Sequence, residues 1–144
     1  MNAPTSKVPR HLWIVGIIAV LWNAMGAFDY AATQFRLDFY MSQFTPEQLE
    51  YFHGFPAWAV ASWAIAVWSS LLASLGLLLR KVWAVWLFGL ALAAMVITFL
   101  YNFVLSDGLS MLGAADVIFT VVIWAIAIFL FFYARSMAKR GVLR

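Results

Sequence analysis

The chain has 144 residues, of which 66% are hydrophobic and only 10% are charged. A soluble domain of this length would have too few charges to cover its surface, so the composition is typical of a protein whose solvent is lipid. The absence of cysteine excludes disulfides, thiolate metal ligands and cysteine nucleophiles. The net charge of +3 comes from short basic segments at predicted helix ends, which favours contact with anionic lipid over nucleic acid.

Four long apolar runs, none of which contains Lys or Arg, cover residues 12–28, 57–79, 82–104 and 111–132. A hydrocarbon core about 30 Å thick is crossed by about 20 apolar residues of helix, so each run is long enough for one crossing. The sequence therefore predicts an all-α fold, an integral membrane four-helix bundle that forms a single domain over 1–144. The predicted helices cover about 12–33, 57–79, 82–104 and 111–133.

Small and polar residues recur along the first predicted helix in steps of three and four, which places them on one face. They are Gly16, Ala19, Asn23, Gly26, Tyr30 and Thr33. Lipid does not penalise an outward Leu or Phe, so we expect this face to form the interior of the bundle. The run has no small-residue cleavage site, and we interpret it as a retained helix; the alternative is a removed signal peptide.

The segment between the first two apolar runs contains a helix-start signal. Thr45-Pro46-Glu47-Gln48 combines an N-cap, a proline at the first helical position and a glutamine at the capping-box position. A short amphipathic helix is therefore predicted from about Pro46 to His53. Glu47 and Glu50 would face water, and Leu49 would face the membrane or the mouth of the bundle. Pro56 then opens the second long helix.

The second and third predicted helices form an antiparallel hairpin, because only a short turn at Arg80 and Lys81 separates them. The second helix carries a nearly continuous seam of small residues: Ala59, Ser62, Ala66, Ser69, Ala73 and Gly76. Such a seam lets helix backbones approach closely. On the third helix we expect one face to point inward and the opposite face to contact lipid. The inward residues are Ala91, Met95, Thr98 and Asn102, and the outward ones are Trp83, Trp86, Leu87 and Leu90.

The fourth predicted helix places Gly113, Asp116, Thr120 and Ala127 on one face, with Asp116 about two turns in from the outer end. Ionisable groups at membrane depth usually face the bundle interior and mark functional sites. The candidate ligand-binding or proton-linked residues are Asp116, Asp29, Asn23, Tyr30, Tyr101 and Asn102. The structural alternative is that Asp29 is interfacial and that Asp116 hydrogen-bonds neighbouring helices.

No catalytic motif is present, and we predict neither an enzyme nor a cofactor. His11 and His53 lie on opposite sides of the membrane, so they cannot share a metal ion. We interpret most of the intramembrane tryptophans as packing against lipid; the alternative is that they line a pocket. They are Trp22, Trp63, Trp68 and Trp124.

Basic residues are concentrated in the N-terminal segment, in the turn between the second and third helices and in the C-terminal segment. They are Lys7, Arg10, Arg80, Lys81, Arg135, Lys139, Arg140 and Arg144. The positive-inside rule assigns these three segments to the cytoplasm. Both termini are therefore predicted to be cytoplasmic, an N-in/C-in topology, with the segment from about Gln34 to Pro56 on the far side.

Short stretches along nearly the whole chain form a distinctive combination. They include Trp22-Asn23, Asp29-Tyr30, Pro46-Glu47-Gln48-Leu49, Pro56-Ala57-Trp58 and Tyr133-Ala134-Arg135-Ser136-Met137. Together they resemble a group of small proteobacterial inner-membrane proteins that often carry the label "sugar transporter". The resemblance implies a four-helix, multi-pass protein of the bacterial inner membrane. The outer segment would then be the first periplasmic loop.

Two functions are consistent with these features. The first is a noncatalytic membrane protein that binds a partner, a lipid or a small ligand, or that serves as an accessory subunit of a membrane assembly. The alternative is an oligomeric small-molecule transporter, for which the family label suggests a sugar, that uses buried Asp29 and Asp116. The expected partners are membrane lipid and either another membrane protein or further copies of this chain. No inverted repeat is visible, so transport would need such copies.

Overall fold

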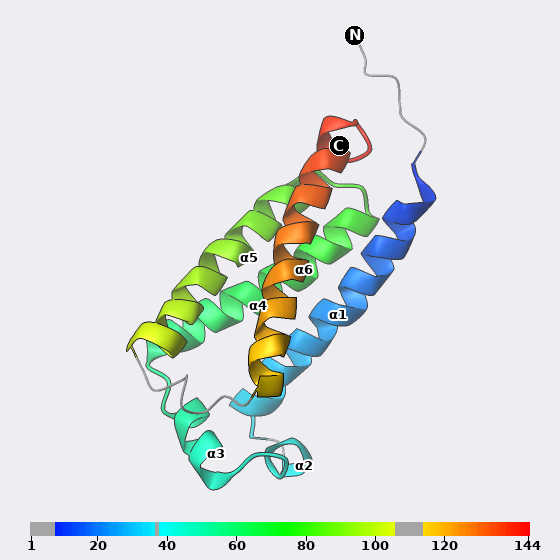
Figure 1. Cartoon of the computed structure of the whole chain (residues 1–144). Coiled ribbons are helices and arrows are strands. Elements are labelled where there is room, and N and C mark those ends of the chain that lie inside the picture. Colours follow the sequence, from blue (N-terminus) through cyan, green and yellow to red (C-terminus); the bar gives the residue numbers. More distant parts are fainter. Residues whose placement is uncertain (1–7, 37, 106–113) are drawn as a thin grey trace.

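The computed structural model describes residues 8–36, 38–105 and 114–144 (Figure 1). Every regular element in this part of the chain is helical. The elements are α1 (Arg10–Gln34), α2 (Asp38–Met41), α3 (Pro46–His53), α4 (Ala57–Leu78), α5 (Trp83–Leu100), the π-helical turn η1 (Tyr101–Leu105) and α6 (Ala114–Lys139).

Four of these helical segments are long and apolar enough to cross a membrane: Arg10–Gln34, Ala57–Leu78, Trp83–Val104 and Val117–Lys139. The all-α prediction is thereby confirmed, and the four segments indicate a multi-pass membrane protein. The last helix ends six residues later than the sequence predicted, at Lys139 instead of 133. The apolar run stops before Arg135, but cations near a helix C-terminus stabilise the helix, so it continues past the apolar part.

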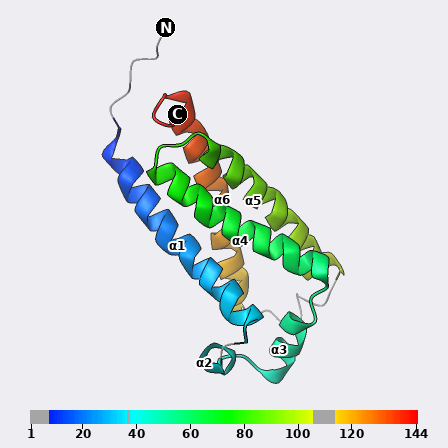
Figure 2. The same ribbon diagram turned by 180° about the vertical axis from the view of Figure 1, so that it is seen from behind.

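Three of the long helices form a layer, with α4 between α1 and α5 (Figure 2). Helix α6 lies across one face of this layer and packs mainly on α5 (Figure 1). Neighbouring helices run antiparallel, so the N-terminal end of α1 and the C-terminal end of α6 lie at the same end of the bundle. We call this the terminal end and the opposite one, where α2 and α3 lie, the outer end.

The close packing of the layer follows from the small residues of α4. All six members of the predicted seam are buried: Ala59, Ser62, Ala66, Ser69, Ala73 and Gly76. On the facing side, Gly16 of α1 leaves room for Leu78, because a Cβ at this glycine would lie 2.9 Å from Cγ of Leu78. The outward face predicted for α5 is observed in part: Trp86 is 77% exposed and Leu90 is also exposed, whereas Leu87 packs against the core and the Trp83 ring lies against Gly76.

The terminal end of the bundle is closed by a packed apolar core. All four long helices contribute, with Leu12, Leu77, Phe88 and Leu130 among the buried side chains. The C-terminal segment docks on the turn between α4 and α5. There the Arg144 N–H donates to the Arg80 carbonyl at 3.0 Å, and the Val82 N–H donates to the Arg144 carbonyl at 3.1 Å.

The outer end carries α3, which begins with the two capping-box hydrogen bonds. The Gln48 N–H donates to Thr45 Oγ1 at 3.1 Å, and the Thr45 N–H donates to Gln48 Oε1 at 3.0 Å. These bonds satisfy backbone donors that a helix N-terminus otherwise leaves unpaired. Helix α3 also contacts α1, because the His53 ring donates from Nε2 to the Thr33 carbonyl at 3.3 Å.

Candidate ligand-binding cavity

A cavity of about 610 Å³ lies between α6 and the layer formed by α1, α4 and α5. Its lining occupies the middle and outer parts of the helices, from Trp22 to Thr33 on α1 and from Phe119 to Leu130 on α6. Phe44, from the segment between α2 and α3, also contributes to the lining. The volume falls in the range of small-molecule sites in proteins, about 300–1,000 Å³.

Aromatic rings bridge the helices around this cavity. Trp22 of α1 meets Phe119 of α6 edge to face, with ring centroids 5.8 Å apart. Phe99 of α5 meets Trp124 of α6 in the same way at 5.9 Å. All four residues line the cavity. Edge-to-face contacts between aromatic rings add stabilisation beyond that of the apolar area they bury. These two contacts therefore hold α6 to the layer of α1, α4 and α5, and the cavity lies beside them.

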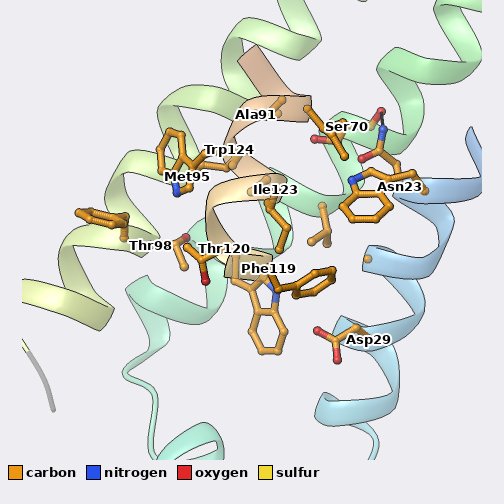
Figure 3. A pocket seen from close by; sticks show the side chains of 18 of the residues that line it. Asn23, Asp29, Ser70, Ala91, Met95, Thr98, Phe119, Thr120, Ile123 and Trp124 are labelled. Carbon is orange, nitrogen blue, oxygen red and sulfur yellow. Dashed lines mark hydrogen bonds between the residues drawn. The ribbon is translucent and has the colours of Figure 1, made fainter. Parts of the chain in front are cut away.

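A polar group lies at the deep end of the cavity, between α1 and α4. Asn23 donates from Nδ2 to Ser74 Oγ at 2.7 Å and to the Ser70 carbonyl at 3.4 Å. The Ser74 hydroxyl in turn donates to the Ser70 carbonyl at 2.8 Å. Asn23 and Ser70 line the same part of the cavity (Figure 3). This group places amide and carbonyl dipoles beside an otherwise apolar wall.

A second polar group comes from α5 and the π-helical turn. Asn102 donates from Nδ2 to the Thr98 carbonyl at 2.9 Å, and the Thr98 hydroxyl lies 2.9 Å from that of Ser62 on α4. Thr98 and Asn102 line the cavity. Single π-helical turns within α-helices often occur at functional sites. Here the turn begins at Tyr101, one residue before Asn102.

Asp29 supplies an acidic side chain to the cavity. Its carboxylate extends from α1 into the space beside the Phe119 ring, on the outer side of Asn23 (Figure 3). Among the described residues that line the cavity, Asp29 is the single Asp, Glu, Lys, Arg or His. The lining therefore combines an apolar and aromatic wall, two polar groups and one acidic side chain.

The structure brings together some of the residues that the sequence singled out. Asn23, Asp29 and Asn102 line one cavity. Tyr30 does not belong to its lining, since its ring packs edge-on against Trp63 with centroids 4.9 Å apart. Tyr101 is also outside the lining and packs between two aromatic rings, 4.7 Å from Phe55 and 5.4 Å from Trp58. Asp116 belongs to α6, but its side chain lies outside the described residues.

The sequence analysis interpreted most of the intramembrane tryptophans as packing against lipid, and for three of them the pocket alternative holds instead. Trp22, Trp63 and Trp124 line the cavity, whereas Trp68 is 42% exposed on the outside of the bundle. Hydroxyl residues that were not candidates also line the cavity: Thr33, Ser70, Thr98 and Thr120.

No protein-family model, curated protein or solved structure matches the chain. The resemblance to small bacterial inner-membrane proteins therefore stays a prediction. That Asn23, Asp29 and Asn102 bind a ligand also stays a prediction, to which the cavity gives a location.

Proposed function

We propose that this protein is a noncatalytic, multi-pass membrane protein that binds a small, largely apolar molecule between α6 and the layer of α1, α4 and α5. The observation that carries the proposal is the cavity of about 610 Å³, whose wall is mostly apolar and aromatic but contains Asn23, Asp29 and Asn102. Known small-molecule sites share this construction, with apolar surface for affinity and a few polar groups for orientation.

The proposed setting is the bacterial inner membrane, with both termini in the cytoplasm. Basic residues of the terminal end support this orientation under the positive-inside rule, among them Arg10, Lys81 and Lys139. Helix α3 would then be an amphipathic helix of the first periplasmic loop. In support, its Glu47 and Glu50 side chains are exposed, whereas Leu49 is half-buried.

Binding is favoured over transport because the terminal end of the bundle is packed. Leu12 and Leu77 are buried in the apolar core of this end, and neither lines the cavity. A transporter needs alternating access to both sides, whereas a binding protein or accessory subunit needs only one opening. Asp29 in the cavity favours the alternative, an oligomeric small-molecule transporter, since intramembrane acids are frequent in transport pathways.

Native mass spectrometry of the purified protein tests the proposal, because it shows a retained small molecule and gives its mass. Gly26→Leu is the blocking variant: a Cβ at Gly26 has Val67 at 4.0 Å as its nearest neighbour, so a longer side chain can extend into the cavity. Ala61→Leu makes a similar addition at an exposed position of α4 and is the control.

We expect the wild-type protein and Ala61→Leu to retain the same small molecule and Gly26→Leu to lose it. If all three proteins carry the same species in equal amount, that species binds elsewhere. If the wild-type protein carries nothing beyond annular lipid, the proposal is wrong.

A further inference from the structure

Two polar atoms at the deep end of the cavity have hydrogen-bonding capacity that the helices do not use. The Asn23 amide bonds to α4 through Nδ2, and one of its acceptors is the Ser70 carbonyl. A carbonyl can only accept, so the amide nitrogen must face it and the amide oxygen must point elsewhere. Within the described part of the chain, neither Asn23 Oδ1 nor the Ser70 hydroxyl forms a hydrogen bond.

Both of these atoms are accessible from the cavity. Among the described residues, no fully buried side-chain nitrogen or oxygen lacks a hydrogen-bond partner, so Asn23 Oδ1 and Ser70 Oγ have open surface. Both residues line the cavity, and they lie side by side in it (Figure 3). The cavity therefore presents an acceptor, Asn23 Oδ1, beside a hydroxyl that can donate and accept.

The depth of this pair restricts the charge of the group that can bind to it. Asn23 directly follows Trp22, the middle residue of the 25-residue helix α1, so it lies near the centre of a membrane crossing. A charged group is costly at this depth, which disfavours an ammonium or a carboxylate. The lining nearby is apolar and includes Ala66 and Ile123. The pair is therefore suited to a neutral polar group on an apolar molecule.

Among neutral groups, a hydroxyl matches the pair best. It can donate to Asn23 Oδ1 and accept from the Ser70 hydroxyl, so both protein atoms gain a partner. A ketone, an ester or an ether can only accept, and it would leave Asn23 Oδ1 without a donor. A primary amide has two N–H groups, of which Asn23 Oδ1 would bind only one, and an unpaired N–H in an apolar site is costly.

We propose that the cavity binds an apolar alcohol, with its hydroxyl between Asn23 Oδ1 and Ser70 Oγ at the deep end and its hydrocarbon body along the apolar and aromatic wall. This inference rests on the proposed function, because it specifies the ligand of the same cavity.

Three probes with the same carbon ring test it: cyclododecanol, the alcohol, cyclododecanone, the ketone, and cyclododecane, the hydrocarbon. Binding is measured by equilibrium dialysis of the full chain in detergent micelles against protein-free micelles. The variants are Ser70→Ala, which removes the hydroxyl, and Asn23→Leu, which removes the amide at nearly the same size. Ser69→Ala is the matched control, because Ser69 is the neighbouring serine of α4 and lies outside the cavity lining.

The wild-type protein and Ser69→Ala are expected to bind cyclododecanol about tenfold more tightly than cyclododecane, as two hydrogen bonds would provide. Cyclododecanone should bind with intermediate affinity, because it can accept from Ser70 but cannot donate to Asn23. Ser70→Ala should lower the affinity for the ketone to that for the hydrocarbon, and Asn23→Leu should remove the advantage of the alcohol over the ketone. If Asn23→Leu does not fold, the comparison of the alcohol with the ketone tests the bond to Asn23 without a variant.

The outcomes separate this inference from the proposed function. Equal binding of the alcohol and the hydrocarbon to the wild-type protein would overturn the alcohol inference and leave the binding cavity standing. An unchanged preference for the alcohol in folded Ser70→Ala and Asn23→Leu would show that the hydroxyl binds elsewhere, which also overturns it. If none of the three probes binds, the inference is wrong, and the proposed function fails with it if Gly26→Leu retains the same species as the wild-type protein.

Discussion

Asn23 joins α1 to α4 within the apolar part of the bundle, and the contribution of its hydrogen bond to the free energy of unfolding can be measured. Its amide donates to Ser74 Oγ at 2.7 Å, and Ser74 is fully buried. Hydrogen bonds between membrane helices contribute about 0.6 kcal/mol on average and up to about 1.7 kcal/mol. We expect Asn23→Ala and Ser74→Ala each to lower the free energy of unfolding, with a coupling energy between them in this range.

A double-mutant cycle measured by unfolding in micelles gives that coupling. The cycle needs the two single variants, the double variant and the wild-type protein, so it carries its own control. Additive effects of the two substitutions would contradict a direct bond between α1 and α4 at this position.

Single residues show how far helical periodicity could locate the site. The steps of three and four that selected Asn23 correctly gave an inward position, because residues on one helix face share their environment. The same steps also placed Tyr30 on this face, but its ring packs against Trp63 and does not line the cavity. Tyr101 was grouped with the site by its depth in the membrane, and its ring packs between Phe55 and Trp58 instead.

At the scale of elements, the contact between α1 and α4 depends on one glycine. A Cβ at Gly16 would lie 2.9 Å from Cγ of Leu78, so the Leu78 side chain or one of the helices must shift to accept it. We expect Gly16→Ala to lower the free energy of unfolding by about 1–3 kcal/mol, as overpacking does elsewhere.

Gly26→Ala is the matched control on the same helix, because the nearest atom to its added Cβ is 4.0 Å away, on Val67. Alanine favours a helix over glycine by up to about 1 kcal/mol, so this variant should be neutral or more stable. Equal destabilisation by both substitutions, measured by thermal unfolding, would show that the two helices are not in close contact at Gly16.

Helix positions were predictable from the sequence, while some helix ends were not. Apolar length located all four spanning helices, since the membrane thickness fixes how many apolar residues a crossing needs. The end of α6 at Lys139 was missed, because hydropathy records where lipid contact stops and not where backbone hydrogen bonding stops. The π-helical turn Tyr101–Leu105 has no signature in apolar periodicity, so the change of helix type at Asn102 was not predicted.

For the whole molecule, the distribution of basic residues predicts the orientation in the membrane. A reporter that is active only outside the cytoplasm should be inactive when fused after Arg144 and active when inserted after Gln43, in the segment between α2 and α3. The insertion serves as the positive control for the fusion. Activity after Arg144 with none after Gln43 would reverse the proposed topology.

The cavity itself could not be derived from the sequence. Periodicity tells which face of each helix points inward, but not how far apart the helix axes lie. Helix α6 packs mainly on α5, and the Trp22–Phe119 contact spans the distance to α1 with two large rings. The space beside this contact arises from the assembly of four helices, and each of them alone shows only an inward face.

Cysteine reactivity tests whether that space exists and contains water when no ligand fills it. The chain has no native cysteine, so Thr120→Cys places a single thiol in the cavity. Val121→Cys places one on the next residue of α6, which is 62% exposed on the lipid-facing side. A thiol reacts as its thiolate, which forms readily in water and hardly at all in hydrocarbon. In lipid bilayers, N-ethylmaleimide should therefore modify Thr120→Cys much faster than Val121→Cys. Equal and slow modification of both would contradict an open cavity between α6 and the other three helices.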